Sequence, residues 1–72
     1  MKLATFNVNG INARLVALIN WLKTSAVDAV ALQETKTTDD QFPKEALAEA
    51  GYDAFFTGQK SYNGVALLVR RG

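Results

Sequence analysis

The sequence pattern predicts a strand, a helix and a second strand, in that order, between residues 2 and 33. This order constrains the fold more than any other feature of the sequence. Lys2 to Val8 is rich in β-forming residues and predicts a first strand, which we expect to be buried on both faces. Val27 to Gln33 is a short apolar run that predicts a second strand. Because a helix connects them, the two strands should pair in parallel with a right-handed crossover.

The segment between these strands predicts a helix from about Ala13 to Lys23. Apolar residues recur there at helical spacing, at Leu15, Leu18, Ile19 and Leu22. The pair Asn9-Gly10 would by itself favour a hairpin, but no second strand follows it directly. We therefore favour the helix and expect Asn12 to be its N-cap.

The second half of the chain predicts a short helix followed by two strands. Asp39 or Asp40 should cap a helix that runs from near Pro43 to Gly51. Tyr52 to Thr57 and Gly64 to Arg70 are strand-like, and the short polar loop between them favours an antiparallel pair. The residues expected in the core include Trp21, Leu47, Phe55 and Phe56. The predicted fold is α/β with the order β-α-β-α-β-β and a mixed sheet, in at most one small domain.

Composition excludes several classes of site. The formal net charge is only +1, so an anionic partner would have to be held by a local patch of basic residues. The chain has no cysteine and no histidine, which excludes disulfides, the usual zinc ligands and Ser-His or Cys-His catalysis within these residues. No apolar stretch approaches the ~20 residues of a membrane span, and Asn7 interrupts the N-terminal apolar run. We expect a cytoplasmic protein with no membrane partner.

Polar residues stand at the ends of the first two predicted strands. In an open α/β sheet, ligands bind outside the carboxyl ends of the strands, and parallel pairing would bring Asn7 and Glu34 to the same edge. A carboxylate beside an amide suits Mg²⁺, which takes oxygen ligands and keeps several waters. One carboxylate does not define a metal site, however. Spacing alone favours the simpler interpretation of a turn residue at Asn7 and a solvated strand end at Glu34.

Basic and aromatic residues near the predicted loops are weaker signals. Arg14, Lys36 and Lys60 could form a cationic rim for phosphates, although basic residues this dispersed are often simply solvated. Tyr62 could stack on a nucleic acid, although a single Tyr beside a turn is more often a packing residue. The loop GQKSYNG lacks the adjoining Gly-Lys-Ser/Thr of a P-loop and leads into a strand, which argues against a nucleoside triphosphate site.

Three stretches in order, FNVNGINAR, LQETK and GYDAFFTGQKSYNGVALL, closely resemble the N-terminal part of the exonuclease III and AP endonuclease family, within the endonuclease/exonuclease/phosphatase superfamily. The resemblance covers the whole chain with compatible spacing. It implies a four-layer α/β sandwich of two packed sheets. It also implies a DNA repair nuclease that uses Mg²⁺, with Mn²⁺ as an alternative ion, to cleave double-stranded DNA beside abasic sites and at 3′ ends.

The same resemblance assigns roles to individual residues. Glu34 corresponds to a metal ligand, and Asn7 corresponds to the residue that orients the attacking water or the scissile phosphate. Asn9 is implied in the hydrogen-bond network behind the metal, with Lys36 close to it. DNA-backbone contacts are implied for Arg14, Lys60 and Tyr62. Asn12 departs from several relatives that carry a phosphate-contacting Arg there.

The resemblance also implies that residues 1–72 are only the N-terminal portion of such a domain. The family's catalytic Tyr, its Asp-x-Asn and its late Asp and His have no counterparts in these residues, so we expect cleavage by this chain alone to be severely impaired. The remainder of the nuclease domain, supplied separately, would then be a partner. Two alternatives are a non-catalytic chain that binds DNA or a complementary fragment, and a phosphodiesterase of the same superfamily with a non-DNA substrate. The QETK and SYNGVALL forms favour the DNA branch.

Overall fold

The computed structural model describes residues 1–57 and 64–71, which form a four-stranded mixed sheet with helices packed on it. The elements in chain order are β1 (Leu3–Asn7), α1 (Leu15–Ser25), β2 (Ala29–Gln33), a 3-10 turn η1 (Asp39–Gln41), α2 (Lys44–Glu49), β3 (Tyr52–Thr57) and β4 (Val65–Arg70). The predicted order of strands and helices is confirmed. No helix in this described part of the chain is long and apolar enough to cross a membrane.

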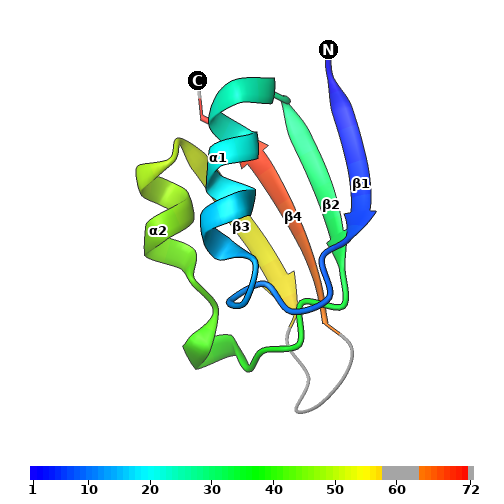
Figure 1. The fold of residues 1–72 in the computed structure, drawn as a ribbon, viewed down its shortest axis with the longest axis vertical. Helices are drawn as coiled ribbons and strands as arrows, with labels where there is room; N and C mark the ends of the chain where they lie inside the picture. Colours follow the sequence, from blue (N-terminus) through cyan, green and yellow to red (C-terminus); the bar gives the residue numbers. More distant parts are fainter. Residues whose placement is uncertain (58–63, 72) are drawn as a thin grey trace.

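The sheet has the strand order β1-β2-β4-β3. β1 and β2 are parallel, with Asn7 opposite Gln33 at their carboxyl ends. β4 lies between β2 and β3 and is antiparallel to both. Both helices cover the same face of the sheet, and the carboxyl ends of β1 and β2 lie together at one edge (Figure 1). The predicted parallel βαβ unit and the antiparallel β3–β4 pair are therefore both present.

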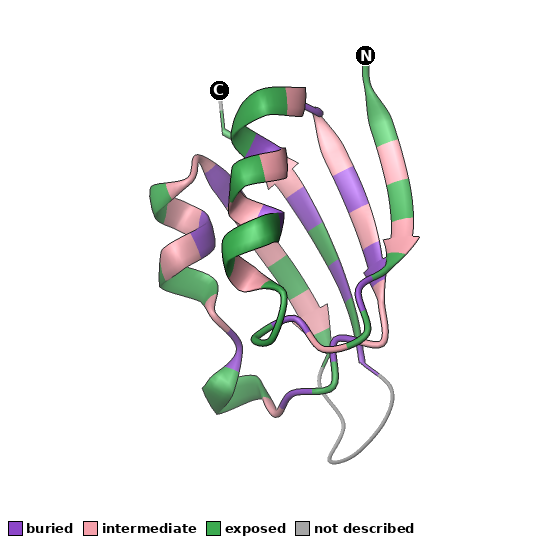
Figure 2. Ribbon diagram, viewed as in Figure 1, coloured by how far each residue is buried: buried purple, intermediate pink, exposed green. Residues whose placement is uncertain are grey.

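The hydrophobic core lies between this face and the helices. Figure 2 marks the buried residues on the strands and the helices in purple. Alternate residues of the central strands point into it, and Val30, Leu32, Ala66 and Leu68 are buried. The helices contribute Leu18, Leu22 and Leu47. Trp21 is half-buried, and its ring meets that of Phe6 edge to face with centroids 5.4 Å apart. Trp21, Leu47 and Phe56 thus belong to the core or pack against it, as predicted.

The opposite face of the sheet is open, and two predictions are wrong for this reason. β1 is not buried on both faces, because every second residue faces away from the helices and Leu3 is 68% exposed. Phe55 is not in the core, because it lies on the same open face and is 62% exposed. Val65 and Leu67 are also exposed there. Within the described residues, no element covers this face.

The helix starts differ from the predicted ones. α1 begins at Leu15, and Arg14 occupies the cap position without a side-chain cap hydrogen bond. Asn12 is not the N-cap, because its amide instead donates to the carbonyl of Gln41 at 3.2 Å and to Oγ1 of Thr37 at 3.4 Å. Asn12 therefore joins the loop after β1 to the loop after β2.

The caps of α2 are partly as predicted. Asp39 and Asp40 do not cap this helix, because they lie in η1, and Pro43 occupies the cap position. The C-terminal prediction is confirmed, since α2 ends at Glu49 and Gly51 follows with a left-handed φ of +94°. Pro43 suits a helix start because its φ is fixed and it has no N–H to leave unpaired.

Candidate functional site

Asn7 and Glu34 meet where β1 and β2 end. The last rung of the parallel pair joins Asn7 to Gln33, and the backbone N–H of Val8 then donates to the carbonyl of Gln33 at 2.9 Å. Glu34 is the next residue after this rung. The predicted juxtaposition of Asn7 and Glu34 at one sheet edge is therefore present in the structure.

A chain of hydrogen bonds fixes the two side chains. Nδ2 of Asn7 donates to Oε2 of Glu34. The other side-chain atom of Asn7, Oδ1, accepts the backbone N–H of Asn9 at 2.9 Å. Because this N–H can only donate, Oδ1 must face it and Nδ2 must face the carboxylate. The amide of Asn7 is thus held in one orientation, and it holds the carboxylate of Glu34 in turn.

Lys36 joins this group from the loop after β2. Its Nζ donates to Oδ1 of Asn9 at 2.6 Å and lies 3.8 Å from Oε1 of Glu34. The Lys36 and Glu34 side chains are 35% and 42% exposed, so their ion pair contributes little to stability. These interactions connect Asn7, Asn9, Glu34 and Lys36, the four residues that the sequence pattern and the resemblance single out, into one cluster.

Left-handed backbone is concentrated in this cluster. Asn9, Glu34 and Lys36 have φ values of +49°, +54° and +53°. Such values are uncommon for residues other than Gly and tend to occur at functional sites. In the loop after β2 they turn the Glu34 and Lys36 side chains outward while Thr35, between them, is buried. The sequence offers no clear signal for this geometry at Glu34 and Lys36, whereas Asn9 is a residue that tolerates it.

Backbone hydrogen bonds attach the loop after β2 to its neighbours on both sides. Gly10 and Ile11 donate to the carbonyls of Glu34 and Thr35, each at 2.9 Å. On the other side, the N–H of Thr35 donates to the carbonyl of Gly64 at 3.1 Å. The segments before and after Glu34 are thus held by the loop after β1 and by the residue that precedes β4.

Gly64 is a residue that sequence reasoning missed. Its φ is +105°, and a Cβ at this position would overlap Oγ1 of the buried Thr35. Glycine therefore allows the start of β4 to approach the loop that carries Glu34 and Lys36. The signal in the sequence was the pair Asn63-Gly64 directly before an apolar strand, which indicates a turn but not a close approach.

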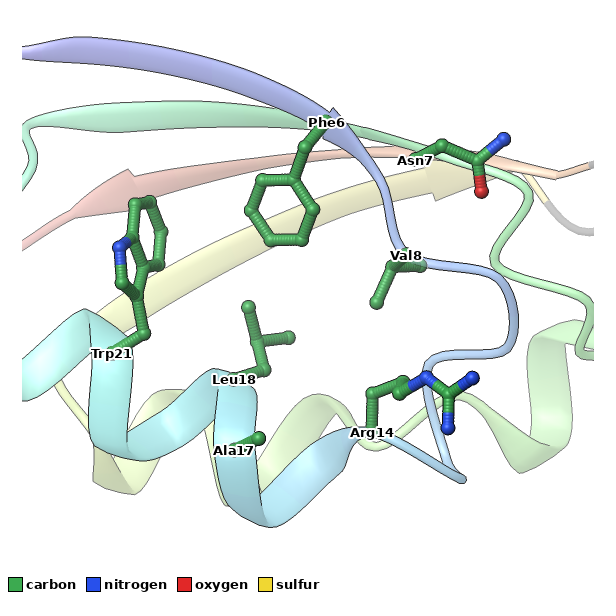
Figure 3. Close-up of a pocket in the computed structure, with 7 residues that line it drawn as sticks. All are labelled: Phe6, Asn7, Val8, Arg14, Ala17, Leu18 and Trp21. Carbon is green, nitrogen blue, oxygen red and sulfur yellow. The ribbon is translucent and has the colours of Figure 1, made fainter.

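Arg14 lies on the helix side of the sheet edge. It lines an open groove of about 440 Å³ together with Phe6, Asn7, Leu18 and Trp21. Figure 3 shows the Phe6 ring directed toward α1, whereas the amide of Asn7 is directed away from the groove. Arg14 is exposed and lies near the site loops, as predicted. Lys60 and Tyr62, the other predicted DNA contacts, fall outside the described residues.

The donor set at the edge fits a hard divalent cation with few protein ligands. Glu34 offers a half-exposed carboxylate of which Oε2 is held by Asn7, while Oε1 lies 3.8 Å from Nζ of Lys36. Mg²⁺ and Mn²⁺ accept such oxygen donors and retain waters in the remaining positions. Among residues 1–57 and 64–71 no group of three or more acidic side chains could surround an ion. Within the described residues, a cation at this edge would therefore meet one carboxylate, that of Glu34, with Asn7 supporting it.

The fold and this edge define a class: an α/β protein with a mixed sheet whose strand ends carry an amide-held carboxylate. The model of the endonuclease/exonuclease/phosphatase family matches residues 4–72. This match covers nearly the whole sequence and agrees with the order of the strands and helices. The chain belongs to this family.

Individual relatives agree with this assignment. Exodeoxyribonuclease III from Haemophilus influenzae is 41% identical over 71 residues, which is 99% of this chain and 27% of that protein. The structure of an AP endonuclease from Archaeoglobus fulgidus superimposes with a TM-score of 0.93 at 43% identity, over 96% of this chain and 27% of that one. The structure of a Neisseria 3′ phosphatase bound to a product DNA hairpin superimposes with a TM-score of 0.93 at 44% identity, over 97% of this chain and 27% of that one. The chain thus spans about a quarter of the length of these relatives.

Proposed function

We propose that this chain forms the metal-binding sheet edge of a DNA repair nuclease that hydrolyses phosphodiester bonds beside abasic sites and at 3′ ends. The observation that carries the proposal is the hydrogen-bonded pair of Asn7 and Glu34 at the carboxyl ends of two parallel strands. Further support comes from relatives whose names describe an exodeoxyribonuclease, an AP endonuclease and a 3′ phosphatase bound to DNA. We place this activity in the cytoplasm.

Glu34 is the proposed ligand of Mg²⁺, with Mn²⁺ as a substitute. A bound cation would polarise the phosphoryl oxygen and stabilise the leaving alkoxide. Asn7 holds the carboxylate through its Nδ2, and Asn9 fixes Asn7 through its backbone N–H. A ligand held in this way keeps its orientation, as outer partners of metal ligands commonly ensure. From the same position at the edge, Asn7 would also orient the scissile phosphate or the attacking water.

Double-stranded DNA is the proposed substrate. Arg14, exposed beside Asn7 on the helix side, would contact a backbone phosphate. Lys60 and Tyr62, which fall outside the described residues, would also contact the DNA backbone. Such contacts position a duplex without reading its sequence, which suits an enzyme that acts at lesions and ends. Further acidic ligands and a general base would come from additional polypeptide of the nuclease domain, because Glu34 alone is a sparse donor set.

A chimeric enzyme tests this function. The aligned 71-residue segment of the Haemophilus exodeoxyribonuclease III is replaced by the present chain, which is 41% identical to it. We expect Mg²⁺-dependent cleavage of a duplex that contains one abasic-site analogue, and stepwise loss of nucleotides from a 3′ end. Chelation of the metal should abolish both. Since outer partners of a metal ligand alone are worth about 10- to 100-fold, Glu34→Gln should lower kcat/KM by on the order of 100-fold or more.

The control variant is Glu49→Gln, an equally conservative change at an exposed carboxylate of α2. It should leave cleavage unchanged. A folded chimera, checked by its thermal transition, that binds the duplex without cleaving it would favour a non-catalytic binding chain. Hydrolysis of a phosphoinositide head group in preference to the abasic duplex would favour a different substrate in the same superfamily. Full activity of the Glu34→Gln chimera would contradict the proposed metal ligand.

A further inference from the structure

The ammonium of Lys36 stands between two acceptors and is bonded to only one of them. It donates to Oδ1 of Asn9 at 2.6 Å but lies 3.8 Å from Oε1 of Glu34, beyond hydrogen-bonding distance. We propose that Asn9 restrains Lys36 so that its ammonium does not occupy Oε1, which stays available to a divalent cation. Asn9 and Lys36 would then be positioning residues that set the affinity of the metal site. This inference rests on the proposed function, since it concerns the same carboxylate.

The two oxygens of Glu34 are not equivalent. Oε2 accepts the amide of Asn7 and is fixed by it, whereas Oε1 faces the side on which Lys36 lies. The Glu34 side chain is 42% exposed, so a cation can reach it from solvent. Oε1 is therefore the oxygen for which an ammonium and a divalent ion would compete.

The backbone places the competing groups at fixed separations. Asn9, Glu34 and Lys36 all have left-handed φ values, and the N–H of Gly10 ties the loop of Asn9 to the carbonyl of Glu34 at 2.9 Å. Thr35 is buried between Glu34 and Lys36, so the segment cannot shift without disturbing the interior. The long, partly exposed Lys36 side chain can nevertheless change its partner by rotation about its own bonds. The hydrogen bond from Lys36 to Asn9 has a charged donor, and such bonds are stronger than those between neutral groups. It can therefore hold the ammonium on Asn9 and away from Glu34.

Removing Asn9 should therefore weaken metal binding through Lys36. Without Oδ1, the ammonium would turn to Oε1 of Glu34 and would have to be displaced by the entering cation. For charges about 4 Å apart in a solvated site, this competition corresponds to about a three- to tenfold loss of affinity. Removing Lys36 instead deletes the competing charge, so affinity should stay the same or rise about threefold. The two neighbouring variants are thus expected to act in opposite directions.

The experiment is a titration of the isotope-labelled chimeric enzyme with Mn²⁺, followed by the broadening of the backbone amide signals of residues 1–72 in NMR spectra. Broadening locates the ion and gives its Kd without any need for activity. The variants are Asn9→Gly, which keeps the left-handed φ of +49° unstrained, Lys36→Met, and the two combined. We expect Asn9→Gly to raise Kd about three- to tenfold and the double variant to return to the value of Lys36→Met.

The controls separate this inference from the proposed function. Glu34→Gln should abolish the local broadening, and Lys36→Gln should reproduce Lys36→Met. Absence of local broadening in the unaltered chimeric enzyme would contradict the metal site of the proposed function and would overturn the inference with it. The inference alone would be overturned if Asn9→Gly left the Kd for Mn²⁺ unchanged. It would also be overturned if the double variant did not return to the Kd of Lys36→Met. If Asn9 had only a structural role, Asn9→Gly would raise the Kd and the double variant would not return to the Kd of Lys36→Met, because removing Lys36 could not restore the lost structure.

Discussion

At the scale of single residues, the candidate site depends on the side chains of Asn7 and Glu34 and on the absence of a side chain at Gly64. The juxtaposition of Asn7 and Glu34 was predictable, because the strand pattern indicated a parallel pair whose carboxyl ends meet at one edge of the sheet. Their role in binding a metal came from the resemblance and stays a prediction. The resemblance had also placed Asn9 and Lys36 nearby. The contact of Gly64 with Thr35 was not predictable, since it depends on how two segments far apart in the sequence approach each other. The left-handed residues Glu34 and Lys36 flank Thr35, whose backbone is hydrogen-bonded to Ile11 on one side and to Gly64 on the other, and these tertiary contacts cannot be predicted from local sequence.

Gly64→Ala should destabilise the chain by about 3 kcal/mol, because it adds a strained left-handed alanine to an overlap with buried Thr35. Gly51→Ala is the matched control. Gly51 has a similar φ of +94°, but a Cβ there meets nothing within 4 Å, so only the conformational penalty of about 1 kcal/mol remains. Urea denaturation of both variants measures the difference. Equal losses for the two glycines would show that the close approach to Thr35 has no energetic weight.

At the scale of elements, the sequence pattern predicted the helices and strands and their pairing, but not the N-terminal caps of the helices. The spacing of Leu15 to Leu22 predicted α1, whereas Asn12 was wrong as its cap because a tertiary hydrogen bond to Gln41 competes with capping. The apolar content of β1 suggested burial on both faces. Alternation alone could not show that one face would be left open, because this depends on what packs against it.

The amino end of the β1–β2 pair is held by Asp28, which sequence reasoning did not single out. Its carboxylate accepts the backbone N–H of Lys2 and the guanidinium of Arg70, each at 2.7 Å. It therefore connects the segments of β1, β2 and β4 at the edge opposite Glu34. The hydrogen bond from Lys2 and then that from Arg70 lower the pKa of Asp28 below its ordinary value of 3.8.

This pKa shift makes a prediction for acid stability. Because the folded-state pKa lies below 3.8, the ionised carboxylate stabilises the fold above that pH, and the stabilisation is lost as pH falls through the folded-state value. Asp28→Asn should lower the free energy of unfolding at neutral pH and should flatten its decline below pH 3.8. Urea denaturation of both proteins between neutral and strongly acidic pH measures the difference. Parallel pH profiles would mean that Asp28 titrates alike in the folded and unfolded chains.

At the scale of the whole molecule, the most prominent feature is the open face of the sheet. Leu3, Phe55, Val65 and Leu67 lie on it with 44% to 68% of each residue exposed. An apolar surface of this kind is typical of a contact surface or of a tendency to associate. The net charge of +1 provides little repulsion between copies. The helix-covered face buries its apolar residues, so association should involve the open face.

Leu67 and Leu68 allow a test of association through the open face. They are adjacent residues of β4 that point to opposite faces of the sheet, and they are 44% and 0% exposed. Leu67→Thr keeps the strand preference while it makes the open face more polar, so sedimentation velocity should show less concentration-dependent association and an unchanged urea midpoint. Leu68→Thr makes the same change in the core and should destabilise the fold by about 3 kcal/mol. If Leu67→Thr associated as strongly as the unaltered chain while remaining folded, the open face would not be the surface responsible. Association would then have to proceed through another surface, such as the groove beside Trp21.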